Sequence, residues 1–287
     1  MPGRHNPTLR QRRLGAELRR MREQAGLGGS ELARTLSVSA AHVTQLETGK
    51  SSVSSDRLRT FAAACGCTNQ PLINALAEMA AERTRNWWDE YRGTLGAAFL
   101  DVAELEGYAE GITTYTITFI PGLLQTKSYA TSVFNRAIPP LPQHEVDTRL
   151  AFRLRRQDLV RSGKSGYSAF IHEAALRMQF SGPTVLSEQL GSLVKDSDSP
   201  SITVRVVPFE IESLPGPSEN FTYARGPVPE LDTIQMDVSY GHLLLDAPTQ
   251  LANYREILTR MASVALTEED SREFILSIKK EIEGRNG

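Results

Sequence analysis

The apolar residues of the first seventy positions recur at helical spacing in short runs that glycines and serines interrupt. Leu14, Leu18 and Met21 follow one another at intervals of four and three, which places their side chains on one face of an α-helix. Gly26 and Gly49 each follow such a run, where a glycine commonly ends a helix. Helices this short are stable only when their apolar faces pack together, so an all-α bundle is expected here.

The same pattern predicts four more helices after the first. They begin at about Ser30, Ser39, Ser55 and Pro71, and the last continues to Tyr91 through the segment NWWDEY. The expected bundle therefore has five helices.

From residue 112 onward the pattern becomes mixed. The segment ITTYTITFI (112–120) alternates polar and apolar side chains, which predicts a β-strand. Further strands are expected near 167–173, 202–210, 220–225, 232–238 and 242–246, and helices near 143–162, 184–196, 248–264 and 267–283. This mixture predicts an α+β fold. We therefore expect an all-α domain over 1–85, a linker or interface helix over 86–111 and an α+β domain over 112–287.

Charge is distributed unevenly between these regions. The whole chain has 32 Lys+Arg and 34 Asp+Glu, but residues 1–85 contain 13 basic and 7 acidic residues, which leaves 19 and 27 for the remainder. This asymmetry suggests that only the first region approaches a polyanion. A solvated, arginine-rich first helix would give the same imbalance, and charge alone does not separate the two interpretations.

Several classes of protein are not expected. Apolar runs of about 18 residues, which a membrane-spanning helix requires, do not occur. The arginine-rich start lacks the apolar region of a secretory signal. Cys65 and Cys67 are the only cysteines, too few for a disulfide scaffold and wrongly spaced for a zinc site. A cytoplasmic protein without a bound metal or cofactor is expected, with no membrane partner.

One stretch, GLGGSELARTLSVSAAHVTQLETGK (26–50), has a specific resemblance. ELA, the VS turn and V..LE.GK together resemble the helix-turn-helix of the lambda Cro and phage-repressor class, also called the Xre or Cro/C1-type family. The resemblance implies a five-helix lambda-repressor-like domain whose recognition helix, capped by Ser39, enters the major groove of double-stranded DNA. It also implies that Glu47 pairs with Arg22 and holds that helix in place.

Position by position, the resemblance assigns the recognition residues. Ala40, Ala41, Thr44 and Gln45 would face bases, with Gln45 able to bond adenine and the alanines able to contact thymine methyl groups. The remaining expected DNA contacts are His42, Thr48, Lys50 and the flanking Arg12 and Arg13. For His42, a solvated surface position is the alternative interpretation, and the sequence slightly favours it.

The start of the preceding helix departs from the family pattern. The family usually has Ser/Thr-Gln there, whereas this chain has Gly28 and Gly29. The usual glutamine contact is therefore missing, although bare backbone N–H groups at a helix N-terminus can bind a phosphate. Few strong base contacts remain, so binding should depend on dimerisation or on DNA shape.

Landmarks along the rest of the chain resemble a second family. WWDEY, PGLLQT..YA, R..RRQ, HEAAL and VRVVPF occur in the order found in the WhiJ-like regulators of actinobacteria. In that family an Xre-type domain precedes a second domain of unknown biochemical role. The resemblance implies transcriptional control and, in some cases, a small partner protein.

Motifs for catalysis are incomplete. SGKSG (162–166) lacks the upstream glycine of a phosphate-binding loop, since position 158 is Asp. HEAAL (172–176) lacks the second histidine of a zinc-binding helix. We therefore expect no catalytic residues and no enzyme.

The helix predicted over 143–162 contains an arginine cluster that permits several interpretations. Arg149, Arg153, Arg155 and Arg156 could form a solvated face, bind an anionic ligand or acidic partner, or contact DNA. Tyr115 and Gln125 could line a pocket, although packing between a strand and the following helix is the simpler interpretation.

Three functions remain open at this point. The first is a homodimeric DNA-binding regulator whose second domain dimerises and senses a ligand or partner. The second is an interaction module that captures an antitoxin-like or antisigma-like protein, with secondary DNA binding. The third is a domain derived from an enzyme that responds to a small-molecule effector.

Overall fold

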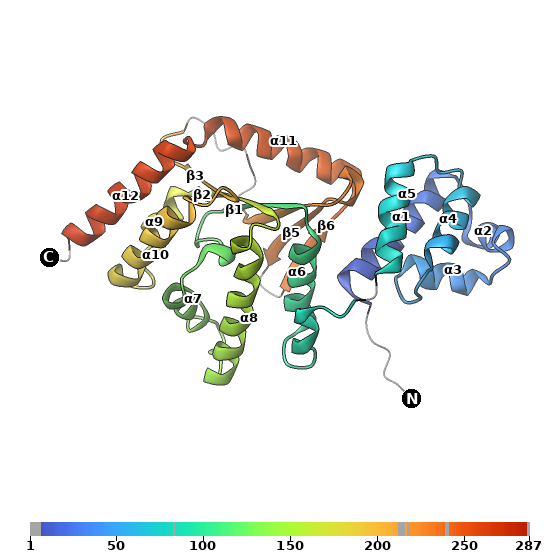
Figure 1. Cartoon of the computed structure of the whole chain (residues 1–287), viewed down its shortest axis with the longest axis horizontal. Coiled ribbons are helices and arrows are strands. Elements are labelled where there is room, and N and C mark those ends of the chain that lie inside the picture. Colours follow the sequence, from blue (N-terminus) through green and yellow to red (C-terminus); the bar gives the residue numbers. More distant parts are fainter. Residues whose placement is uncertain (1–6, 83, 212–215, 217–218, 239–240, 286–287) are drawn as a thin grey trace. The chain divides into compact units, whose positions relative to one another are not determined.

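The computed structural model describes residues 7–82, 84–211, 216, 219–238 and 241–285 (Figure 1). The chain forms two compact units. Unit 1 comprises Met1–Tyr108 together with Pro227–Leu231, and unit 2 comprises Ala109–Gly226 and Asp232–Gly287. The division of the sequence at residues 85 and 111 stays a prediction.

Unit 1 contains the expected helical bundle. Its helices are α1 (Leu9–Gln24), α2 (Gly29–Thr35), α3 (Ala40–Glu47), α4 (Ser55–Ala64) and α5 (Gln70–Ala81). Side chains of Thr8, Ser39, Ser54 and Asn69 cap four of these helices by accepting a backbone N–H. The apolar positions predicted from periodicity meet in one core, in which Leu18, Leu32, Leu58 and Leu76 are fully buried.

The predicted fifth helix was too long. Helix α5 ends at Ala81 because Glu82 adopts an extended backbone conformation, with φ −66° and ψ 120°. Residues Trp87–Tyr91 instead form a separate 3-10 helix, η1, and α6 (Ala97–Tyr108) follows. Trp88 is buried and packs edge-on against Tyr108, with the two ring centroids 5.9 Å apart. This aromatic contact holds η1 against α6 rather than extending α5.

Unit 2 is built on a mixed six-stranded sheet, which confirms the predicted α+β fold. The strands are β1 (Gly111–Thr116), β2 (Gly166–His172), β3 (Ile202–Val207), β4 (Phe221–Arg225), β5 (Thr233–Val238) and β6 (Gly241–Leu245). Their order is β3-β2-β1-β4-β5-β6; β1, β2 and β3 run parallel, whereas β4, β5 and β6 pair antiparallel.

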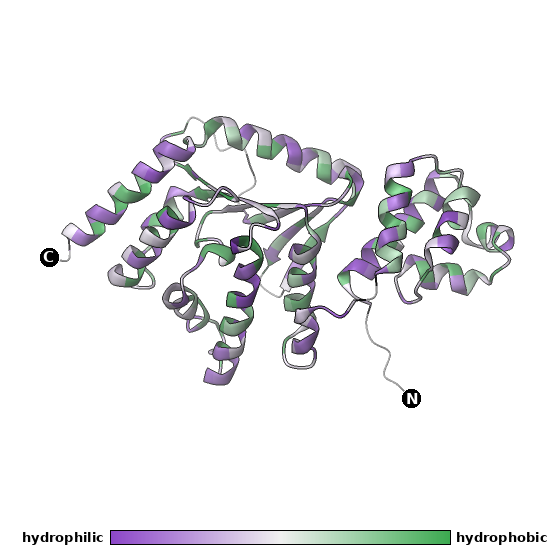
Figure 2. Ribbon diagram, in the orientation of Figure 1, coloured by the Kyte–Doolittle hydropathy of each residue, from purple (hydrophilic) through white to green (hydrophobic). Residues whose placement is uncertain are grey.

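Helices cover both faces of this sheet (Figure 1). The helices of unit 2 are α7 (Lys127–Phe134), α8 (Gln143–Arg161), α9 (Glu173–Arg177), α10 (Pro183–Asp196), α11 (Pro248–Val264) and α12 (Glu268–Gly284), with the 3-10 helix η2 (Gly122–Leu124). The 3-10 helix η3 (Pro229–Leu231) belongs to unit 1. Helix α11 lies over one face, and α7, α8 and α10 lie over the other. Apolar and polar residues alternate along α11 and α12, as amphipathic helices require (Figure 2). None of the helices in the described part of the chain is long and apolar enough to cross a membrane.

The first strand is shorter than the sequence predicted. It ends at Thr116, and residues 117–126 form an irregular segment that includes η2. Three buried glutamines satisfy its backbone: Gln125 Nε2 donates to the carbonyl of Ile120 at 2.7 Å. Gln157 Nε2 donates to the carbonyls of residues 122 and 125, and Gln189 bonds both the carbonyl of residue 124 and the N–H of residue 126. Periodicity cannot reveal this arrangement, because side chains replace the missing ladder of backbone bonds.

Candidate nucleic-acid interface

Helix α3 presents its first turn to solvent. Ser39 has an extended backbone conformation, and its Oγ accepts the N–H of His42 at 3.1 Å. Ser39, Ala40 and Ala41 are exposed, so the backbone N–H groups at the start of the helix are accessible. The opposite face is closed, since Val43 and Leu46 are buried in the core of unit 1.

A close crossing fixes α3 against α1. A Cβ built on Gly15 of α1 would lie 2.6 Å from the carbonyl oxygen of Glu47 and 2.7 Å from that of Leu46. Only glycine permits this approach, which periodicity did not predict. The pairing expected from the family resemblance is also present: Arg22 Nε and Nη2 donate to the two carboxylate oxygens of Glu47 at 2.6 and 3.0 Å.

This ion pair is linked to the chain that leads into α2. Arg22 Nη1 also donates to the carbonyl of Leu27 at 2.9 Å. The hydrogen bond that Arg22 donates to Glu47 raises the pKa of Arg22, so the guanidinium stays charged. Glu47 therefore helps to hold α3 in position.

The other end of α3 is closed by a glycine. Gly49 has φ +70°, its N–H donates to the carbonyl of Leu46, and the N–H of Lys50 donates to the carbonyl of Gln45 at 2.9 Å. This is the bonding pattern in which a left-handed glycine ends a helix. A Cβ on Gly49 would also lie 2.6 Å from the carbonyl oxygen of Gln11 of α1, so both ends of the crossing require glycine.

Gln45 is exposed and oriented by a neighbour. Ser51 Oγ donates to Gln45 Oε1 at 3.1 Å, which leaves the Nε2 hydrogens of Gln45 directed away from this bond. A bonded side chain loses less rotamer freedom when it contacts another molecule. The sequence did not indicate this role for Ser51.

The other expected recognition residues differ in exposure. Thr44, Thr48 and Lys50 are exposed, and the hydroxyls of the two threonines donate to carbonyls one turn earlier, those of Ala40 and Thr44. His42 is half-buried, and its Nε2 is buried with no hydrogen-bond partner among the described residues. Any contact by His42 would therefore involve the other ring nitrogen.

The two glycines at the start of α2, Gly28 and Gly29, have open space around them. Gly28 precedes the helix with no side-chain cap, and a Cβ on Gly28 or Gly29 would meet nothing within 4 Å. These glycines therefore serve no packing contact, which keeps their backbone accessible. Between α2 and α3, Ser37 adopts φ +54°, a left-handed conformation that glycine usually occupies.

The two arginines expected to flank the interface are both engaged by unit 1. Arg13 is buried and donates to the carboxylate of Glu17 and to the carbonyl of Glu230. Arg12 is partly exposed and donates to Asp101 at 2.6 Å and to the carbonyl of Pro7 at 2.7 Å. The structure does not place Arg13 in position for a phosphate, because burying a paired guanidinium removes it from solvent.

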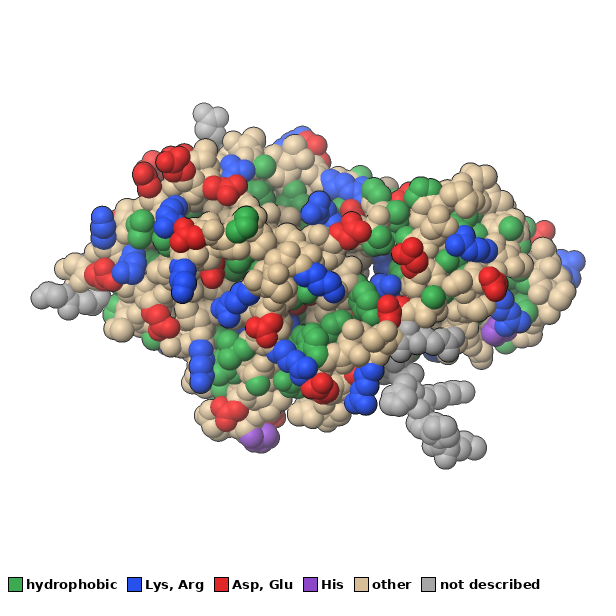
Figure 3. All heavy atoms as spheres, in the orientation of Figure 1, with side chains coloured by type: hydrophobic (Ala, Val, Ile, Leu, Met, Phe, Trp, Pro, Cys, Tyr) green, Lys and Arg blue, Asp and Glu red, His purple; other side chains and the backbone are tan. Residues whose placement is uncertain are grey.

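Two arginines of the α8 cluster, Arg149 and Arg153, are engaged by their own unit. Arg153 donates to Gln125 Oε1, and its guanidinium carbon lies 4.4 Å from the centroid of the Phe134 ring. Arg149 donates to Glu145 at 3.1 Å, and Arg155 and Arg156 also have interaction partners. On the face of unit 2 drawn in Figure 3, basic and acidic side chains are interspersed rather than segregated.

The structure brings Gln125 and Arg153 together but places Tyr115 in the sheet core. Tyr115 is fully buried, and burial raises its pKa to about 12. Its hydroxyl has no hydrogen-bond partner among the described residues. The simpler interpretation of Tyr115 and Gln125, packing of a strand and loop against a helix, accounts for these contacts.

The other sequence landmarks of unit 2 have structural roles. His172 Nδ1 accepts the N–H of Ala174 and so caps α9. Buried Glu173 accepts from Arg177 at 2.6 Å and from the N–H of Phe209 at 2.9 Å. Arg205 of β3 donates to three carbonyls at the end of α11, at distances of 2.6 to 2.9 Å. In the described parts of the chain, no group of three or more His, Cys, Asp or Glu could hold a metal ion.

Comparison with known families agrees with this geometry. A model described as a helix-turn-helix domain matches residues 13–76, which span α1 to α5. Comparison with curated proteins and with solved structures gives no significant match. A model described as a domain of unknown function, DUF5753, matches residues 99–277, more than half of the chain. The chain has the helix-turn-helix expected of a DNA-binding regulator and belongs to the DUF5753 family.

Proposed function

We propose that this protein is a sequence-specific transcriptional regulator of the Xre, Cro/C1 type with a WhiJ-like second domain. The observation that supports this most is the exposed first turn of α3, held in place by the Gly15 crossing and the Arg22–Glu47 pair. A rigid, solvent-facing helix N-terminus of this kind is what a major groove accepts.

Base contacts are assigned to the exposed face of α3. Gln45, oriented by Ser51, reads adenine or guanine, and the methyl groups of Ala40 and Ala41 contact thymine. Ser39, His42, Thr44 and Thr48 complete this surface.

Phosphate contacts are assigned to the edges of the same surface. Lys50 neutralises one phosphate, and the backbone N–H groups beside Gly28 and Gly29 bind another. Arg12 serves as an auxiliary contact only if it leaves Asp101, and Arg13 is omitted because it is buried.

Such a surface has few strong contacts, so the proposal includes a homodimer. Two copies place their recognition helices at half-sites about 34 Å apart, or a multiple of this distance, on a pseudo-palindromic operator. Unit 2 supplies dimerisation and the response to a ligand or partner. Many of the polar side chains of unit 2 described above form hydrogen bonds and ion pairs within that unit. We therefore propose a regulator without enzymatic activity.

Genome-wide mapping of bound DNA followed by gel shifts tests this proposal. We expect preferential binding to a mapped upstream fragment over random DNA, and an affinity that falls steeply with salt concentration. Equal affinity for both DNAs at moderate salt would refute sequence-specific recognition.

A second candidate function is capture of a small antitoxin-like or antisigma-like protein by unit 2. The exposed apolar side chains Ile138, Phe209 and Leu243, exposed by 96%, 56% and 48%, are separate points at which such a partner could make contact. Native mass spectrometry of the purified chain distinguishes this candidate: a stoichiometric partner protein supports it, and a homodimer alone supports the first.

A further inference from the structure

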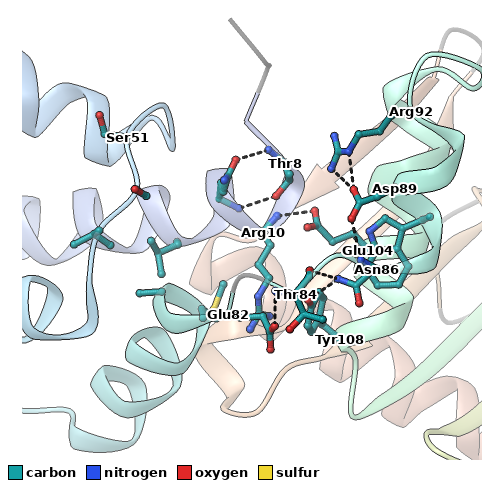
Figure 4. Close-up of a pocket in the computed structure, with 17 residues that line it drawn as sticks. Thr8, Arg10, Ser51, Glu82, Thr84, Asn86, Asp89, Arg92, Glu104 and Tyr108 are labelled. Atoms are coloured by element: carbon teal, nitrogen blue, oxygen red, sulfur yellow. Dashed lines mark hydrogen bonds and ion pairs between the residues drawn. The ribbon is translucent and has the colours of Figure 1, made fainter. Parts of the chain in front are cut away.

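A cavity of about 350 Å³ lies within unit 1, beside the start of α1. The 17 lining residues come from α1, the segment after α3, the end of α5, η1 and α6 (Figure 4). Its size falls within the range of small-molecule sites. It is separate from the exposed face of α3 described above.

Arg10 is the principal charged group in this cavity. Its side chain extends from α1 toward Tyr108 and Glu82 (Figure 4), and its guanidinium carbon lies 3.9 Å from the centroid of the Tyr108 ring. Its Nε is buried and has no hydrogen-bond partner among the residues described. Asn86 Nδ2 donates to the Tyr108 hydroxyl at 2.9 Å, so the ring beneath the guanidinium is fixed. A guanidinium stacked on a fixed ring is suited to a carboxylate.

The remaining charges define the other half of the ligand. Arg92 and Asp89 neutralise each other at 2.6 Å, which leaves Arg10 and Glu104 as the charged pair considered for a ligand. Glu104 Oε2 accepts the backbone N–H of Arg10 at 3.0 Å, so it is held near that residue. One cation beside one carboxylate suits a ligand that has one carboxylate and one ammonium group.

The rest of the wall is apolar. Leu14, Val53, Met79 and Trp88 line the same cavity. From these features we infer that the cavity binds an amino-acid-like zwitterion with an apolar body, its carboxylate on Arg10 and its ammonium toward Glu104.

The cavity is also joined to the recognition helix. Ser51 lines the cavity, and its Oγ is the donor that orients Gln45. A ligand that bonds Ser51 therefore competes with Gln45 and changes DNA binding, a consequence that rests on the proposed function.

Three probes that share a phenylethyl group test the site on the unaltered protein: L-phenylalanine, 3-phenylpropionate and 2-phenylethylamine. Trp88 is in the cavity wall, so tryptophan fluorescence reports binding directly. We expect L-phenylalanine to bind at millimolar concentration or tighter, and at least about fivefold more tightly than each probe that lacks one charge. Equal affinity for all three, or no fluorescence change with L-phenylalanine, overturns the inference.

Variants assign the two charges separately. Arg10→Met should weaken L-phenylalanine and 3-phenylpropionate but not 2-phenylethylamine, whereas Glu104→Gln should weaken the two amines and spare 3-phenylpropionate. Arg57→Met, at an exposed position of α4 outside the cavity, is the matched control and should bind all three probes normally. Circular dichroism confirms folding, and equal losses for all three probes in a folded Arg10→Met protein would refute the charge assignment.

The link to DNA is measured on a fragment that the protein binds specifically. Saturating L-phenylalanine should change the Kd for this fragment at least about threefold, and Ser51→Ala should abolish the change. An unchanged Kd overturns the coupling. Absence of specific DNA binding in every condition would refute the proposed function instead, while the fluorescence titration still tests the cavity.

Discussion

Helix α3 of unit 1 and helix α8 of unit 2 use their polar side chains in opposite ways. On α3, within the described part of the chain, the side chain of Thr44 bonds its own helix and that of Gln45 bonds the adjoining Ser51, and both residues are exposed. On α8, Arg153 and Gln157 bond the irregular segment 117–126. Judged by sequence alone, the arginine-rich helix α8 is better suited to bind an anion. In the structure, however, the side chains on the outer face of α3 are less engaged in contacts within the protein. Exposed polar side chains that the fold does not use for its own contacts therefore identify the proposed recognition surface better than the number of charged residues on a helix does.

The largest expected effect concerns the crossing that positions α3. Gly15→Ala places a Cβ 2.6 Å from a backbone carbonyl oxygen that cannot rotate away, so α1 and α3 must separate. We expect the free energy of unfolding of unit 1 to fall by about 2 kcal/mol and specific DNA binding to be lost. Urea denaturation and gel shifts measure the two effects. Gly96→Ala is the control, because this exposed residue of unit 1 lies outside the proposed interface and its Cβ meets nothing within 4 Å, and equal behaviour of the two variants would show that the crossing does not matter.

The next effect tests the opposite use of polar groups on α8. Gln157→Leu leaves the buried carbonyls of Gly122 and Gln125 without their donor, which should lower the stability of unit 2 by about 2 kcal/mol. Gln143→Leu, at an exposed position of the same helix, should change stability little. Urea unfolding followed by circular dichroism compares them. DNA binding should persist in both variants at temperatures where unit 2 is folded, and its loss would contradict the contrast between the helices.

The same contrast shows what a sequence can predict. The bundle, most strands of the α+β domain and the Arg22–Glu47 pair were predictable, because periodicity and the helix-turn-helix motif are local signals. The end of β1 at Thr116 and the end of α5 at Ala81 were not, because distant glutamines and the Trp88–Tyr108 contact decide them.

The site residues also differ in whether local spacing or a distant contact determines their position. The exposed positions of α3 follow from helical spacing, but the burial of Arg13 depends on Glu230, which lies 217 residues away in the chain. Nothing in the sequence signalled Arg10 or the place of Ser51 beside it, because both depend on a cavity that forms only after folding.

Helices α3 and α8 can be compared directly by the preference of substituted proteins for specific over random DNA. Gln45→Ala removes the oriented amide, and we expect it to reduce preference for the specific fragment about tenfold, or by about 1–2 kcal/mol, with little change in stability. Arg153→Met should do the reverse, since Arg153 bonds Gln125 and stacks on Phe134. Competition gel shifts with specific and random DNA, combined with thermal melts, separate the outcomes. A loss of discrimination in Arg153→Met would assign α8 to the DNA-binding surface.

The smallest expected effect concerns the turn between α2 and α3. Ser37 has φ +54°, a conformation that costs a non-glycine residue free energy, and its side chain is exposed. Ser37→Gly should therefore raise the free energy of unfolding of unit 1 by about 0.5 kcal/mol, because relief of this strain exceeds the added entropy of the unfolded chain. Ser37→Ala, which keeps a Cβ, should bring no gain, and urea denaturation resolves the pair. If glycine and alanine act alike, the left-handed turn is not strained, and the orientation of α3 depends on its contacts with α1 alone.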